Sequence, residues 1–169
     1  MIYDRKFIGA GEVIIAKSPS VIWTVLGSCI TVVFYSPMHK TAIFSHAQLP
    51  ENNKQGVKCH TNCIHPCYTV DKSEPSLKYV SCSINYMIEM AAKENFIKNK
   101  TKVLLFGGAS MFGFTMTTQT VGTQNYEMAR KYLKDNGLHI DFEDVGGTQG
   151  RKIIFDTQFG EFTLTYTNA

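Results

Sequence analysis

The sequence predicts an α+β fold, arranged as a single-domain layered α/β/β sandwich with mostly antiparallel or mixed strands and two principal helices. Segments rich in β-branched and aromatic residues occur along the whole chain, whereas only two segments carry apolar residues at helical spacing. Strands at both ends, with two helices between them, do not alternate regularly enough for a doubly wound parallel sheet. The length of 169 residues fits one domain over residues 1–169 with a substantial core.

The expected strands share β-branched or aromatic composition, and they lie at residues 12–17, 23–35, 41–46, 102–106, 114–120, 151–156 and 161–166. The first expected helix covers residues 75–95, and Pro75 suits its first turn. The second covers residues 124–136 and is followed by Gly137, the expected position of a left-handed cap. Each helix has one apolar stripe that it can bury against a sheet.

Residues 51–75 interrupt this pattern and predict a surface insertion rich in cysteine and histidine. Cys59, Cys63, Cys67 and His65 could together supply tetrahedral zinc ligands, but the tight C-x-x-C knuckle of most zinc sites is missing. The pattern favours incidental thiols over a metal site, and a redox-sensitive loop is a further hypothesis. We expect no cofactor.

Composition and charge exclude several classes of protein. The 17 basic and 14 acidic residues are scattered, which argues against nucleic acid as a partner. The first twenty residues carry charges that interrupt any signal peptide, and no apolar run approaches the roughly 20 residues of a membrane span. Five cysteines, an odd number, argue against a disulfide framework. We expect a cytoplasmic protein that does not insert into membranes.

Cys29 is the candidate nucleophile. It follows Gly27 and Ser28 between two strand-like apolar runs, a position from which a thiol can be presented and where main-chain N–H groups can stabilise an oxyanion. His46 ends the run at residues 41–46, and a hairpin through residues 36–40 would bring it to Cys29 as a base. The alternative is a small buried cysteine and a hydrogen-bonded histidine, and spacing alone does not decide between the two.

Four blocks extend this pattern along the chain. They are residues 26–29 (Leu-Gly-Ser-Cys), 44–50 (Phe-Ser-His-Ala-Gln-Leu-Pro), 106–112 (Phe-Gly-Gly-Ala-Ser-Met-Phe) and 143–152 (Glu-Asp-Val-Gly-Gly-Thr-Gln-Gly-Arg-Lys). In this order they resemble the bacterial chemoreceptor glutamine deamidase family, CheD. The resemblance covers nearly the whole chain except residues 51–75.

The resemblance implies a cysteine-dependent amidohydrolase that converts glutamine to glutamate on the cytoplasmic helices of methyl-accepting chemotaxis receptors. It places the catalytic cysteine at Cys29 and the histidine at His46. The threonine that orients the histidine falls on Thr24, with Thr31 as the alternative. The implied route is a thioester, which would also permit weak methylesterase activity.

Several assignments stay open at this stage. Gly27, Ser28 and Ser110 are candidates for the substrate or oxyanion region, although the 107–110 segment reads equally well as a tight turn. Arg151 is expected to be a solvated arginine, with a receptor carboxylate as the alternative partner. The resemblance also permits a different function, a non-catalytic chemotaxis adaptor that regulates a CheC-type phosphatase. A thiol peptidase is a third possibility, for which so short a chain offers no extended peptide groove.

Overall fold

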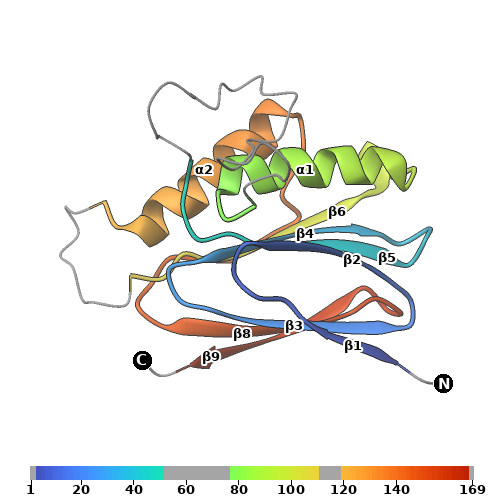
Figure 1. Cartoon of the computed structure of the whole chain (residues 1–169), viewed down its shortest axis with the longest axis horizontal. Helices are drawn as coiled ribbons and strands as arrows, with labels where there is room; N and C mark the ends of the chain where they lie inside the picture. The colour runs from blue at the N-terminus through green and yellow to red at the C-terminus, as the bar shows by residue number, and fades with distance from the viewer. Residues whose placement is uncertain (1–2, 52–76, 111–118, 168–169) are drawn as a thin grey trace, which may run out of the picture.

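The computed structural model describes residues 3–51, 77–110 and 119–167. Two helices cover one face of a five-stranded sheet, and a four-stranded sheet packs against the opposite face (Figure 1). The predicted α/β/β sandwich with two principal helices is therefore confirmed. Among the described residues, no helix combines the length and apolar character that crossing a membrane requires.

The five-stranded sheet has the order β2-β5-β4-β6-β7, formed by Glu12–Lys17, Thr41–His46, Ile30–Ser36, Lys102–Gly107 and Phe142–Val145. All neighbours in it are antiparallel except β6 and β7. The four-stranded sheet has the order β1-β3-β8-β9, formed by Asp4–Phe7, Ser20–Leu26, Gly150–Asp156 and Glu161–Thr167. Only β1 and β3 run parallel there.

The helices are α1, Val80–Lys93, and α2, Val121–Asp135, and a short 3-10 turn, η1, covers Lys98–Lys100. Thr120 caps the start of α2, since its hydroxyl accepts a hydrogen bond from the Thr123 N–H at 3.2 Å. Gly137 follows the end of α2 at φ +64°, as expected of a left-handed cap.

The core has two parts because the central sheet is covered on both faces. One cluster lies between the helices and the five-stranded sheet, and the other lies between the two sheets. Every residue of β4 and β5 is buried. Such continuously buried strands explain why both segments are almost entirely apolar or small.

Some predicted boundaries are wrong. The run at residues 23–35 is two strands, β3 and β4, separated by the turn at residues 27–29. The strands β1 and β7 were not predicted, because each has four residues with a largely exposed pattern. The first helix begins at Val80, and the second begins at Val121. The strand expected at 114–120 and the insertion at 51–75 fall almost wholly outside the described residues.

Candidate active site

Cys29 lies in the turn between β3 and β4, at one end of the interface between the two sheets. β3 ends at Leu26 and β4 begins at Ile30, so three residues make the connection from one sheet to the other. The thiol is half-buried and packs against the apolar cluster between the sheets. The candidate nucleophile is thus held where the chain crosses between layers.

His46 is the last residue of β5 and is only 5% exposed. β4 and β5 form the predicted hairpin, in which Val33 lies opposite Phe44 and Ile30 is bridged to Ala47. In this register Cys29 and His46 are diagonal neighbours, a separation that their side chains can bridge. Side-chain alternation directs both toward the four-stranded sheet.

Thr24, on β3 of that second sheet, meets the imidazole from the other side. Its Oγ1 lies 2.9 Å from Nδ1 of His46, and both atoms are buried. The Thr24 hydroxyl donates its single proton to the Ile8 carbonyl at 2.8 Å. The same carbonyl lies 3.4 Å from Nδ1. Because the hydroxyl proton is already used, Oγ1 accepts from Nδ1–H.

This contact determines the tautomer of the neutral imidazole. With its proton on Nδ1, His46 has the lone pair on Nε2, the atom that a general base uses. Ile8 is itself held beside β3, since its N–H donates to the Trp23 carbonyl at 3.0 Å. His46 stands on the five-stranded sheet, and it is therefore oriented by the Thr24 side chain of β3 and by the backbone of Ile8, which directly follows β1.

Burial shifts the two titrating groups in opposite directions. It lowers the pKa of His46, and the hydrogen bond to the Ile8 carbonyl and the Glu12 carboxylate only partly oppose this. Burial raises the pKa of the Cys29 thiol, against a smaller lowering by its own backbone N–H. Both shifts favour the uncharged forms at neutral pH. A protonated thiol and a neutral imidazole on the same face suit proton transfer during attack rather than a standing ion pair.

The 107–110 segment supports the Cys29 turn through backbone hydrogen bonds. The N–H of Gly108 donates to the Cys29 carbonyl at 2.8 Å, and that of Ala109 donates to the Gly27 carbonyl at 2.9 Å. Gly107 has φ +107°, and a Cβ there would overlap the Cys29 carbonyl oxygen. These N–H groups hold protein carbonyls, so this segment acts as a support. The positive-φ glycines beside the turn are Gly107 and Gly108, not Gly27.

Two buried hydroxyl groups belong to the strand that follows the turn and to the segment that supports it. Thr31 Oγ1 and Ser110 Oγ are both buried, and neither has a hydrogen-bond partner within the described part of the chain. The backbone N–H of Ser110 is satisfied, since it donates to the Gly147 carbonyl at 2.8 Å. Thr31 thus makes no hydrogen bond to His46, and the contact with the imidazole comes from Thr24.

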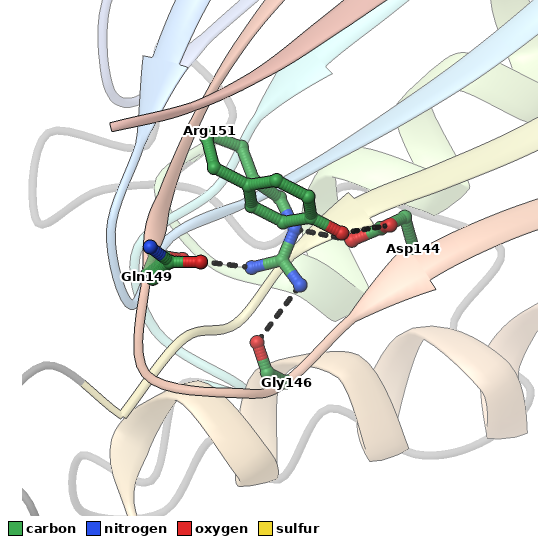
Figure 2. A network of polar contacts seen from close by, with 5 residues as sticks. Asp144, Gly146, Gln149 and Arg151 are labelled. Carbon is green, nitrogen blue, oxygen red and sulfur yellow. Dashed lines mark hydrogen bonds and ion pairs between the residues drawn. The ribbon is translucent and has the colours of Figure 1, made fainter. Parts of the chain in front are cut away.

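Arg151 differs from its prediction as a solvated arginine, because it is 3% exposed. Its Nε donates to Asp144 at 2.5 Å, and its two terminal nitrogens donate to the carbonyls of Gln149 at 3.2 Å and Gly146 at 2.8 Å (Figure 2). The hydroxyl of Tyr166 donates to the other Asp144 oxygen at 2.7 Å. A buried guanidinium thus organises residues 144–151.

This network borders a cavity of about 570 Å³ that is open to solvent and is not lined by Cys29, His46 or Thr24. The network still reaches the site through the backbone. The N–H of Gly146 donates to the Gly107 carbonyl at 2.9 Å, next to the segment that holds Cys29. Arg151 therefore has a structural role: its ion-pair partner is Asp144, and the loop that it organises is bonded to the segment that supports Cys29.

Sequence reasoning also missed Asn125, a fully buried residue of α2 that hydrogen-bonds the Cys29 turn. The signal was its place at helical spacing with Ala129 and Tyr132 on the buried face, where a polar residue needs a partner.

Within the described residues no group of three or more potential metal ligands comes together. Cys59, Cys63, Cys67 and His65 lie outside them.

Comparisons with known proteins agree on one family. The family model described as CheD, chemotactic sensory transduction, matches residues 67–166. A protein named probable chemoreceptor glutamine deamidase CheD 2 from Geobacter sulfurreducens is 35% identical over 162 residues, 96% of this chain and 89% of the relative. The chemoreceptor glutamine deamidase CheD of Thermotoga maritima is 28% identical over 161 residues, 95% of this chain and 90% of the relative.

Proposed function

Because the chain belongs to the CheD family, we propose that it is a protein-glutamine deamidase in which Cys29 is the nucleophile, His46 the base and Thr24 the residue that orients the base. The observation that carries this proposal is the Thr24–His46 contact, in which a buried hydroxyl accepts from Nδ1–H and so determines the tautomer of the imidazole. The imidazole lies on the same face of the hairpin as Cys29. A structural histidine would need a partner too, but it would not need Nε2 unprotonated beside a thiol.

The first half of the reaction forms a thioester. The Cys29 thiol gives its proton to Nε2 of His46 as the sulfur attacks the carboxamide carbon of a substrate glutamine. We assign the oxyanion to main-chain N–H groups of the turn formed by Gly27, Ser28 and Cys29. The imidazolium then returns the proton to the departing nitrogen, so that ammonia leaves and the acyl group stays on sulfur.

The second half restores the enzyme. His46, neutral again, takes a proton from a water molecule as the water oxygen attacks the thioester carbon. The carbon–sulfur bond breaks, the thiolate regains the proton, and the glutamine side chain departs as glutamate. A glutamate methyl ester would follow the same route with methanol as the leaving group. Thr24 keeps the imidazole in one orientation through both steps, a role that a carboxylate has in serine proteases.

The substrate in this proposal is the cytoplasmic region of chemotaxis receptors. Relatives over most of the chain are named chemoreceptor glutamine deamidases, which supports this choice. The resemblance also admits an adaptor for a CheC-type phosphatase. An oriented imidazole and a thiol on one face favour the enzyme, because an adaptor requires neither.

The test is mass spectrometry of a chemoreceptor cytoplasmic fragment incubated with the protein. Hydrolysis of an amide to an acid adds about 1 Da for each glutamine converted. We expect this gain with the wild type and none with Cys29→Ala or His46→Ala. Equal spectra from the wild type and Cys29→Ala would rule out the proposed mechanism.

A further inference from the structure

Asn125 joins the two chain segments that carry the candidate nucleophile and base. It lies on α2 and is fully buried. Its Nδ2 donates one hydrogen bond to the Ser28 carbonyl and one to the Gln48 carbonyl, both at 2.9 Å. Ser28 immediately precedes Cys29, and Gln48 lies two residues after His46. One side chain therefore spans both halves of the site.

These bonds occur where the hairpin stops holding itself together. The last backbone pair between the two segments is Ile30 with Ala47, which exchange hydrogen bonds at 2.9 Å in each direction. Beyond this pair, the Ser28 and Gln48 carbonyls both accept from Asn125. The amide thus continues the cross-strand connection by one step. Since carbonyl oxygens only accept, the NH₂ group must face them, and this orients the side chain.

The helix that carries Asn125 also packs closely against the 107–110 segment, which supports the Cys29 turn. Gly122 lies three residues earlier on the same face of α2, and a Cβ at Gly122 would come within 2.5 Å of the Gly108 carbonyl oxygen. Gly108 in turn donates its N–H to the Cys29 carbonyl. Because α2 and the 107–110 segment touch through backbone atoms, the part of α2 that carries Asn125 has little freedom to shift toward or away from this segment.

We propose that Asn125 is a positioning residue for the deamidation, acting through the backbone of Ser28 and Gln48 to hold the Cys29 thiol and the His46 imidazole at the spacing that proton transfer requires. The proposal rests on the proposed function for its reaction. Within the described part of the chain, the hydrogen bonds of Asn125 go to these two backbone carbonyls and not to the thiol or the imidazole. Its effect is on the mutual placement of two groups that stand on different segments, where a displacement of about 1 Å can cost on the order of 100-fold in rate.

The diagnostic variant is Asn125→Asp, which keeps the shape but places an oxygen against the two carbonyls. Asn125→Ser is a second variant that adds no charge and retains one donor, in case the aspartate variant does not fold. The matched control is Asn136→Asp, since Asn136 follows the same helix and its Nδ2 donates to the Tyr132 carbonyl at 2.8 Å, away from the site. Circular dichroism compares the folding of all three.

Two measurements separate positioning from general loosening. For deamidation of the receptor fragment, we expect kcat to fall about tenfold or more in the Asn125 variants with KM nearly unchanged, because Asn125 is fully buried and bonds to backbone carbonyls of the protein. The second measurement is the pH dependence of Cys29 alkylation by iodoacetamide, with the modified cysteine identified by peptide mass. In the wild type we expect the alkylation rate to rise as His46 loses its proton, and in the Asn125 variants we expect this rise to be lost. Cys82, which is fully buried, should remain protected.

The inference is overturned if the Asn125 variants match Asn136→Asp in kcat and in the pH profile of Cys29 alkylation. It is also overturned if Cys82 becomes reactive together with Cys29, since the variants would then have loosened the whole fold. If the wild type does not deamidate the fragment, the proposed function fails separately. The alkylation profile alone then decides whether Asn125 sets the relation between Cys29 and His46.

Discussion

Thr24→Val is the substitution whose effect follows most directly from the structure. Valine has nearly the shape of threonine, so the buried site between the sheets keeps its packing while the hydroxyl is removed. Nδ1–H of His46 then loses the acceptor at 2.9 Å, and the Ile8 carbonyl loses its donor at 2.8 Å. Only the longer contact of 3.4 Å between Nδ1 and the Ile8 carbonyl remains to orient the ring.

An unsatisfied buried polar group costs about 1–3 kcal/mol. If the loss falls on the oriented imidazole in the transition state, kcat/KM for deamidation decreases by about 5- to 150-fold. The assay is the rate of ammonia release from a glutamine-containing receptor fragment.

Thr31→Val is the matched control, because Thr31 is also fully buried but its hydroxyl has no partner among the described residues. We expect nearly unchanged activity and equal or slightly higher stability for this variant. Wild-type kcat/KM in Thr24→Val, or a larger loss in Thr31→Val, would refute the assignment of Thr24.

Three further predictions concern pH and the supporting structure. Burial lowers the pKa of His46, so kcat/KM should fall with decreasing pH through an inflection below the usual value of about 6.5. The free energy of unfolding should also decrease as the pH falls below about 6.5, because His46 is protonated more readily in the unfolded chain than in the folded protein. Urea titrations of the wild type and His46→Gln at two pH values measure this difference. Arg151→Leu should destabilise the fold by about 3 kcal/mol, since it leaves the partly buried Asp144 carboxylate without its cation and the Gly146 carbonyl without its donor. Arg130→Ala, at an exposed pair, should cost less than about 1 kcal/mol in the same urea titration. Gly122→Ala should cost about 1–3 kcal/mol and reduce the deamidation rate, because its methyl group would displace α2 from the support of Cys29.

The parts of the fold that the sequence predicted are those with strong local patterns. The hairpin of β4 and β5 is apolar throughout and interrupted by an evident turn, and its register brings Cys29 and His46 to one face. The strands that escaped prediction, such as β1 with Asp4–Phe7, have few buried residues and exist because a neighbouring strand pairs with them. Such pairing is a tertiary effect that no local pattern contains.

The candidate site divides in the same way. Cys29 and His46 are candidates by residue type near a turn and a strand end, and the resemblance to the CheD family favours them over the alternative of two buried structural residues. The choice between Thr24 and Thr31 needed the packing of two sheets, because Thr24 meets His46 across the layer and not along the chain. Arg151 was predicted on the surface because arginines usually are. Its burial depends on Asp144 and on two backbone carbonyls of a loop whose path only the fold determines.

The most direct test of the central claim is the identity of the covalent intermediate. The protein is quenched in acid during turnover of a glutamine peptide, and its digest is analysed by mass spectrometry. We predict that the fragment containing Cys29 gains the mass of the peptide minus that of ammonia, which is about 17 Da. An adduct on another cysteine, or full deamidation by Cys29→Ala, would contradict it.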